Sequence, residues 1–166
     1  MSTKNLYSEE AKQKIKELAL GIDFAIMVTK LSSKPLHMVP MSTKKVDDMG
    51  DIWFLSGKDS NHNMNLKNDN DMHLLYADKS AMKFLNVYGK GFISTDIEIL
   101  KELYQSSDDA WFEGVNDPNL TAIRVQPLHA FYWDPKDNKL ITLLKMGVGA
   151  VTGNEPDVMN EGELRV

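Results

Sequence analysis

The sequence predicts a mainly β domain of the α+β class, in which antiparallel strands close as a barrel and helices flank them. Short segments rich in β-branched and aromatic residues alternate with turn residues along most of the chain. Helical periodicity and helix caps appear before the first of these segments and again between later ones. The 166 residues contain no internal repeat, so we expect one domain over residues 1–153, followed by an acidic C-terminal tail over residues 154–166.

The first predicted element is an amphipathic helix of about three turns. Ser8 can cap it, and Glu9 and Glu10 lie in its first turn, where the positive end of the helix dipole favours negative charge. Gly21 ends the helix. The apolar residues that recur at helical spacing are Ala11, Ile15, Leu18 and Ala19.

Short strands are predicted for most of the remaining chain. The first two, at 23–31 and 35–42, form a hairpin, and the polar stretch 43–50 is predicted to be a loop. Further strands are predicted at 51–56, 72–77, 83–94, 120–133 and 139–146, the last two as a closing hairpin.

Capping residues, glycine and proline mark the interruptions between and within these strands. Ser60 can cap a short helix that runs to about Lys67, and Asp96 opens another helix. Gly89 is predicted to form a bend or bulge, and Pro127 indicates an edge or bulge position because it cannot donate to a strand ladder.

The bulk composition excludes several classes of function. With a net charge of -5 and a pI of about 5.3, the chain lacks the basic surface that general nucleic-acid binding needs. It has no cysteine, which excludes disulfides and thiolate metal sites. Its first ten residues are polar, and no apolar run approaches the roughly 20 residues of a membrane helix. We therefore expect a cytoplasmic protein with neither a nucleic-acid nor a membrane partner.

The common catalytic and metal-binding motifs are absent from the sequence. It contains no P-loop and no Gly-x-Gly-x-x-Gly turn between a strand and a helix. The four histidines lack the spacing of a helical zinc site, and no Gly-x-Ser-x-Gly elbow presents a serine nucleophile. We therefore expect no metal site and assign no catalytic residue.

A candidate anion site lies where a predicted strand leads into the helix that Ser60 begins. The first turn of a helix presents backbone N–H groups and the positive end of the helix dipole. Ser56, Ser60 and Asn61 add hydroxyl and amide groups, and Lys58 and His62 can add positive charge. The arrangement fits a phosphate, although an ordinary capped helix would show the same pattern.

The three tryptophans, Trp53, Trp111 and Trp133, are candidates for stacking on a flat ring. Aromatic side chains also bury large areas in cores and interfaces, which is their more frequent role. The sequence alone leaves both interpretations open.

Several short motifs follow one another between about Leu6 and Gly153. They are His37-Met38-Val39-Pro40-Met41, Asp51-Ile52-Trp53-Phe54-Leu55-Ser56, Lys58-Asp59-Ser60, Tyr76-Ala77-Asp78, Val87-Tyr88-Gly89-Lys90-Gly91, Trp111-Phe112, Asp117-Pro118 and Phe131-Tyr132-Trp133-Asp134. No single motif is specific, but their order and spacing resemble the pyridoxamine 5'-phosphate oxidase-like family of FMN-binding split barrels, in its general stress protein 26 branch.

The resemblance implies a six-stranded antiparallel split β-barrel that forms a homodimer, with FMN in a groove between the two chains. The resemblance implies that the isoalloxazine ring is lined by His37, Met38, Val39, Pro40 and Met41. It places Phe54, Leu55 and Ser56 beside the flavin and its ribityl chain, and Ser60, Asn61 and His62 at the phosphate. From the partner chain it places Trp133 near the ring, with Trp111 as the weaker candidate.

Two positions depart from the family pattern. Val39 stands where an Arg precedes the Pro-Met pair, and His62 stands where a Lys often binds phosphate. Both departures remove a fixed positive charge, since the ordinary pKa of a histidine is only about 6.5. The residues after Trp133 also lack the Arg and His cluster that binds substrate phosphate in true pyridoxamine 5'-phosphate oxidases, so that activity is not expected.

These features lead to two main hypotheses for function. The first is an FMN-dependent oxidoreductase that acts on an unknown small molecule, with the flavin supplying the redox chemistry. The alternative is a non-catalytic flavin binder that serves as a carrier or sensor. A third hypothesis is a dimer that has lost ligand binding. The sequence identifies neither the substrate nor the electron donor.

Overall fold

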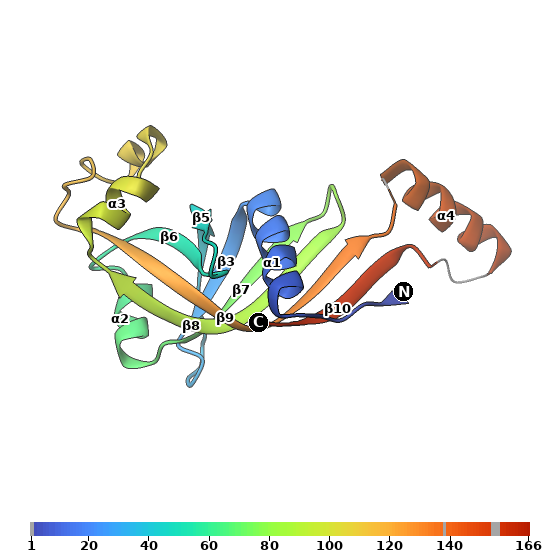
Figure 1. Cartoon of the computed structure of the whole chain (residues 1–166), viewed down its shortest axis with the longest axis horizontal. Helices are drawn as coiled ribbons and strands as arrows, with labels where there is room; N and C mark the ends of the chain where they lie inside the picture. The colour runs from blue at the N-terminus through green and yellow to red at the C-terminus, as the bar shows by residue number, and fades with distance from the viewer. Residues whose placement is uncertain (1, 138, 154–156) are drawn as a thin grey trace.

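The structure is a computed structural model that describes residues 2–137, 139–153 and 157–166. Within these ranges, ten strands form one sheet, with four α-helices and a 3-10 turn around it, which confirms the mainly β, α+β class (Figure 1). The strands are β1 (Ser2–Thr3), β2 (Leu6–Tyr7), β3 (Phe24–Thr29), β4 (His37–Ser42), β5 (Lys45–Val46), β6 (Ile52–Gly57), β7 (Asp71–Asp78), β8 (Lys83–Ser94), β9 (Leu120–Pro135) and β10 (Met159–Arg165). The helices are α1 (Ser8–Ile22), α2 (Asn61–Asn68), α3 (Ile97–Leu103), the 3-10 turn η1 (Ser106–Ala110) and α4 (Lys139–Thr152).

Strand β9 divides the sheet into two parts. β8 pairs with one edge of β9, while two strands share the other edge: β6 pairs with residues 120–125, and β10 pairs with residues 129–135. From β8 the sheet continues through β7 and β3 to β4, with antiparallel pairing at each step. The predicted hairpin of β3 and β4 is therefore confirmed.

The expected six-stranded closed barrel is not confirmed. β4 and β6 contact each other, but among the described residues no ladder of hydrogen bonds joins them, so the sheet stays open. The strand count is higher than expected because short strands and β10 join the sheet. One of these short strands, β5, lies in the stretch that was predicted to be a loop.

The predicted bulge lies in the middle of the pairing between β8 and β9. The register shifts between Tyr88 and Gly89, so that Gly89 faces Pro127 whereas Tyr88 faces His129. A Cβ on Gly89 would lie 2.3 Å from the carbonyl oxygen of Gln126, which is closer than any side chain can approach. Glycine is therefore required at this crossing, and the interpretations of Gly89 and Pro127 are both confirmed.

Helix α1 covers the inner face of the sheet. Its buried residues join one core with inward-facing side chains of β3, β7 and β8, and they are the predicted set Ala11, Ile15, Leu18 and Ala19. The start of the helix differs from the prediction. Tyr7 is the N-cap residue, and Ser8 lies inside the helix with a φ of 49°, so the Ser8 hydroxyl does not cap it.

The opposite side of the sheet, here called the outer face, carries apolar side chains in contact with solvent. Cross-strand pairing joins Pro40, Ile26, Leu75, Asn86 and Phe131 in one row across five strands. Large side chains on this face are exposed by 36% to 56%, namely Phe24, Ile26, Met38, Leu75, Phe84 and Phe131. Apolar surface of this extent is typical of a contact surface.

The region after β9 differs most from the prediction. Residues Lys139–Thr152 form helix α4, not the strand predicted at 139–146, and α4 projects from one end of the sheet (Figure 1). A short apolar run fits either a buried strand or a helix, because periodicity alone does not separate the two. None of the helices in the described ranges is long and apolar enough to cross a membrane.

The prediction of an acidic C-terminal tail is wrong for Met159–Arg165, because these residues form the strand β10. This strand pairs with β9 on one edge and with β1 and β2 on the other. Its sequence contains few apolar residues because little of it faces the core. Leu164 is fully buried, and a Cβ on Gly162 would lie 2.0 Å from the carbonyl oxygen of Lys4. The sheet therefore extends to Arg165.

Replacing Leu164 with alanine tests whether β10 contributes to the core. The change deletes a fully buried side chain, so we expect the free energy of unfolding to fall by about 2–5 kcal/mol. Val166, which is 40% exposed just beyond the strand, provides the control, and V166A should change the free energy by less than about 0.5 kcal/mol. Urea unfolding followed by circular dichroism measures both variants. Equally small effects would show that this segment does not pack on the core.

Candidate functional site

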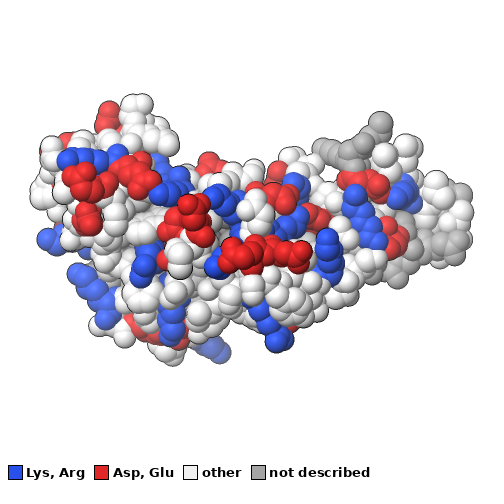
Figure 2. All heavy atoms as spheres, in the orientation of Figure 1, with Lys and Arg blue, Asp and Glu red and all other residues white. Residues whose placement is uncertain are grey.

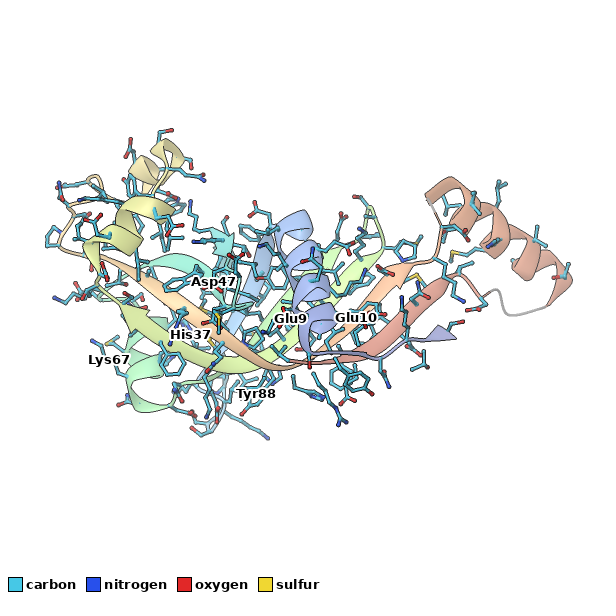
Figure 3. All side chains as sticks on the ribbon, in the orientation of Figure 1. Glu9, Glu10, His37, Asp47, Lys67 and Tyr88 are labelled. Carbon is cyan, nitrogen blue, oxygen red and sulfur yellow. The ribbon has the colours of Figure 1, made fainter. Side chains whose placement is uncertain are left out.

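The start of α2 lies where several strand ends meet. β6 ends at Gly57, whose ladder partner Leu120 begins β9, and α2 begins after a short turn. α2 also contacts β3 and β4, which brings the paired residues Thr29 and His37 to the same place. Figure 3 shows His37 in the same half of the molecule as Lys67 of α2. Residues far apart in the sequence therefore form one cluster around the first turn of α2.

Ser60 caps α2 as predicted. Its backbone is extended, and its side-chain oxygen accepts a hydrogen bond from the backbone N–H of Asn63 at 3.3 Å. The remaining N–H groups of a first helical turn have no partner within the helix, which makes this end suited to an anion. Asn61 lies at the exposed start of the helix, and Lys58 is exposed in the preceding turn. The structure thus confirms the capped helix start on which the anion-site prediction rests.

A buried hydrogen-bond network attaches this helix start to the sheet. The Ser56 hydroxyl donates to Oδ1 of Asn63 at 2.8 Å, and Nδ2 of Asn63 donates to Oγ1 of Thr121 at 2.9 Å. The Thr121 hydroxyl in turn donates to the Ser56 carbonyl oxygen at 2.9 Å. The three side chains are 0–3% exposed. The predicted flavin contact Ser56 therefore has its hydroxyl committed to holding α2 against β6 and β9.

Two histidines from different elements stack beside the first turn of α2. The ring centroids of His37 on β4 and His62 on α2 are 6.2 Å apart, with 28° between the ring planes. Nδ1 of His37 lies 3.4 Å from Oγ1 of Thr29, which also accepts a hydrogen bond from Nδ2 of Asn65 at 3.1 Å. His62 itself is only 8% exposed, and its Nε2 atom is buried without a hydrogen-bond partner. Leaving a polar atom in that state costs about 1–3 kcal/mol.

Burial, together with a smaller effect of the nearby His37, lowers the pKa of His62 to about 4. His62 is therefore uncharged at neutral pH. The cluster offers an anion the helix start and its hydrogen-bond donors, but His62 adds no standing positive charge. This agrees with the sequence interpretation that His62 in place of Lys removes a fixed cation, and it corrects the expectation that His62 can add positive charge to the anion site.

The residues predicted to line the flavin ring divide between the two faces of β4. Val39 and Met41 pack against the main core, and His37 shares their face. Met38 and Pro40 point to the outer face, where the Met38 side chain is 56% exposed. Of this set, only Met38 and Pro40 present side chains to a ligand on the outer face.

The predicted contacts Phe54 and Leu55 on β6 are both buried. Phe54 is fully enclosed in the main core, and Leu55 belongs to a second apolar cluster beneath α3. Contacts of these two residues with a flavin would have to come from their main chain.

Trp133 lies away from the α2 cluster within one chain. Trp133 follows Thr121 by twelve residues on β9, which corresponds to roughly 40 Å of strand. Its indole N–H donates to Oε2 of Glu161 on β10 at 3.1 Å. Trp111 is 82% exposed after η1. A contact between Trp133 and a ligand at α2 of the same chain is therefore not expected.

Sequence reasoning missed four polar residues of the cluster. Asn63 could have been found, because an amide three residues after a Ser cap lies on the inner side of the first turn. Asn65 follows on the same short helix. Thr29 and Thr121 carry no local signal, because strand pairing and helix packing alone bring them to α2.

A hollow of about 660 Å³ lies elsewhere, between α1, the N-terminal segment and the end of β9. Glu9, Glu10 and Glu17 line it, together with the ion pair of Lys14 and Asp134. Figure 3 labels Glu9 and Glu10 on α1, and Figure 2 shows acidic and basic side chains interspersed over the middle of this face. Carboxylates repel phosphate, so this hollow does not suit FMN.

The pH dependence of stability tests the buried state of His62. The pKa of His62 is about 4 in the folded protein and about 6.5 in the unfolded chain. The contribution of neutral His62 to the free energy of unfolding is therefore complete above pH 6.5 and is lost as the pH falls toward 4. Between pH 7 and pH 4.5 the wild type should lose about 2–3 kcal/mol more than His62→Gln. Urea unfolding of both proteins at the two pH values measures this. Parallel losses would show that His62 is not buried as a neutral group.

Comparison with known sequences identifies one family. The chain matches the model described as pyridoxamine 5'-phosphate oxidase like over residues 10–157. General stress protein 26 of Bacillus subtilis (strain 168) is 24% identical over 79 residues. That match covers 46% of this chain and 56% of the Bacillus protein, so the similarity spans little more than half of the relative.

Solved structures show the same fold over most of the chain. A candidate general stress protein 26 from Jannaschia sp. CCS1 has a TM-score of 0.75 at 19% identity, covering 95% of this chain and 98% of that one. The general stress FMN/FAD binding protein from Xanthomonas citri has a TM-score of 0.65 at 25% identity, covering 79% and 93% respectively. The family model, which spans most of the chain, and the shared fold lead to one conclusion: this chain is a member of the pyridoxamine 5'-phosphate oxidase-like family, and it is similar to general stress protein 26.

Proposed function

We propose that two copies of this chain bind FMN in a groove between them and act as an oxidoreductase on a small molecule. The observation that carries the proposal is the cluster at the start of α2, which stands beside β4 and its exposed residues Met38 and Pro40. Family membership supports a flavin, and one structure of similar fold belongs to a protein named as FMN/FAD binding.

The charged end of FMN suits the start of α2. A phosphate there would accept hydrogen bonds from the first-turn N–H groups and from the amide of Asn61. The buried Nε2 atom of His62, which lacks a partner, lies in the same turn and is consistent with a missing polar neighbour. The donor set therefore fits a single phosphate group.

The ring end of FMN suits the outer face. Met38 and Pro40 present apolar side chains there, and Met is well adapted to pack against a flat aromatic ring. A bound flavin supplies the electron-transfer chemistry, while the chain orients it and excludes water from one face of the ring.

The second copy would be held by the outer face. The row from Pro40 through Ile26 and Leu75 to Phe131 is apolar except at Asn86. Two-fold pairing of one such surface with itself is the commonest way in which soluble proteins assemble. It would also let Trp133 of one chain approach a ligand held by the other.

Titration with FMN, followed by tryptophan fluorescence, tests the flavin site. We expect saturable quenching with one flavin per chain. Met38→Asp should weaken FMN binding about tenfold or more, because a carboxylate would be buried against the ring. A tenfold loss of affinity corresponds to only about 1.4 kcal/mol of binding free energy. Met49→Asp, at a 71% exposed loop position, should leave the affinity unchanged. Wild-type protein that shows no saturable response to FMN would contradict the proposal.

Size-exclusion chromatography with light scattering tests the dimer. The wild type should show twice the chain mass of 18.8 kDa. Leu75→Glu should run as a folded monomer, because two-fold pairing would bury the introduced charge near its own copy. Met49→Glu should remain dimeric. A monomeric wild type would remove the proposed groove.

A second candidate function is a flavin carrier or sensor without turnover. The neutral His62 favours it, because this residue then adds no standing positive charge beside the phosphate and the flavin would exchange readily. Consumption of NADH or NADPH in the presence of FMN separates the two functions. Turnover above the rate with free FMN identifies an oxidoreductase, and saturable binding without turnover identifies a carrier.

A further inference from the structure

The unpartnered nitrogen of His62 is the least satisfied polar group in the candidate site. His62 is more than nine-tenths buried, it lies in the first turn of an eight-residue helix, and its Nε2 atom has neither a hydrogen-bond partner nor access to solvent. Buried polar atoms of folded proteins nearly always have partners, so an orphan in a binding site points to a partner that arrives with the ligand.

Few charged groups surround His62. On the elements packed against α2, β3 carries no titratable side chain, and β4 contributes only His37. The charged groups of β8 and β9 are paired elsewhere: Lys83 with Glu17, Lys90 with Asp71, Arg124 with Asp51, His129 with Glu163 and Asp134 with Lys14. Lys67 lies in the last turn of α2. Lys58 and Asp59 are exposed in the loop that precedes this helix.

We propose that His62 binds the flavin phosphate only as it takes up a proton, so that this site selects phosphorylated flavin more strongly as the pH falls. The proposal rests on the flavin site proposed above. The proton comes from solvent, and it ends on the imidazole of His62, whose N–H then donates to a phosphate oxygen. Because Nε2 is closed to solvent, the side chains around it, including the stacked ring of His37, must shift for the contact to form.

The direction of the effect follows from linkage. In the protein alone, burial and His37 hold the pKa of His62 at about 4, so the ring is neutral at pH 7. A phosphate dianion beside it favours the charged ring and raises that pKa. A group whose pKa rises on binding takes up protons, and affinity therefore increases as the pH decreases. The gain in FMN affinity is limited near pH 6, because the phosphate itself begins to take up a proton at that pH.

The experiment compares FMN with riboflavin, which has the same ring but no phosphate. We expect the dissociation constant of FMN to fall about tenfold from pH 8 to pH 6, because proton uptake by His62 accompanies binding of the phosphate. The dissociation constant of riboflavin should stay constant within about twofold over the same range. Calorimetry of FMN binding at pH 7 in two buffers of different ionisation enthalpy should also report net proton uptake.

Three variants assign the effect to His62. His62→Lys should bind FMN more tightly than the wild type at pH 8 and show little change down to pH 6, because its charge is permanent in this range. His62→Gln should keep the riboflavin affinity and lose the pH dependence of FMN binding. Lys67→Gln, at the other end of α2, should keep the wild-type pH profile.

Two different failures can be told apart. If neither FMN nor riboflavin binds the wild type at any pH, the flavin site itself is wrong. If both bind, but the pH profiles of FMN and riboflavin coincide or the FMN profile survives in His62→Gln, then the flavin site stands and the role of His62 is overturned.

Discussion

Hydrogen bonds among three buried side chains, Ser56, Asn63 and Thr121, hold the start of α2 against β6 and β9, and the rest of the site depends on them. Asn63 also takes part in the helix cap, since its backbone N–H donates a hydrogen bond to the side-chain oxygen of Ser60. The helix start and its attachment to the sheet are therefore one structure. Because these groups are buried, water cannot replace a lost partner, and loss of one side chain would leave the others unsatisfied. His62, the residue before Asn63, is positioned by the same network.

Electrostatics distinguish this site from the family pattern that it resembles. Where a Lys would provide a permanent charge, His62 is buried, neutral and stacked on His37. In the proposed site, His62 would then leave phosphate binding to the helix start and neighbouring donors, and neutral hydrogen bonds are weaker than charge-assisted ones. The affinity of the proposed site would depend on pH, whereas that of a site with Lys would not in the neutral range.

The division of the sheet at β9 explains why one chain contains only part of the proposed groove. β6 and β10 share one edge of β9, so the α2 cluster and Trp133 lie at opposite ends of this long strand. The apolar outer face lies between them, with Leu75 near its middle. A second copy packed on this face would bring the two ends together across the interface. The hollow beside α1 has the wrong charge for this purpose, since carboxylates line it.

Local chemistry by itself determined α1, the hairpin of β3 and β4, the Ser60 cap, the bulge at Gly89 and the order of motifs that indicates the family. In each case a few neighbouring residues carry the signal: helical spacing, alternation, a capping hydroxyl or a residue that lacks a side chain. Only the tertiary structure decided that residues 139–152 form a helix, that β10 completes the sheet, and that Thr121 and His37 meet α2. The positions of β10, Thr121 and His37 depend on contacts between distant segments, and the burial that makes His62 neutral arises only when such segments pack around it.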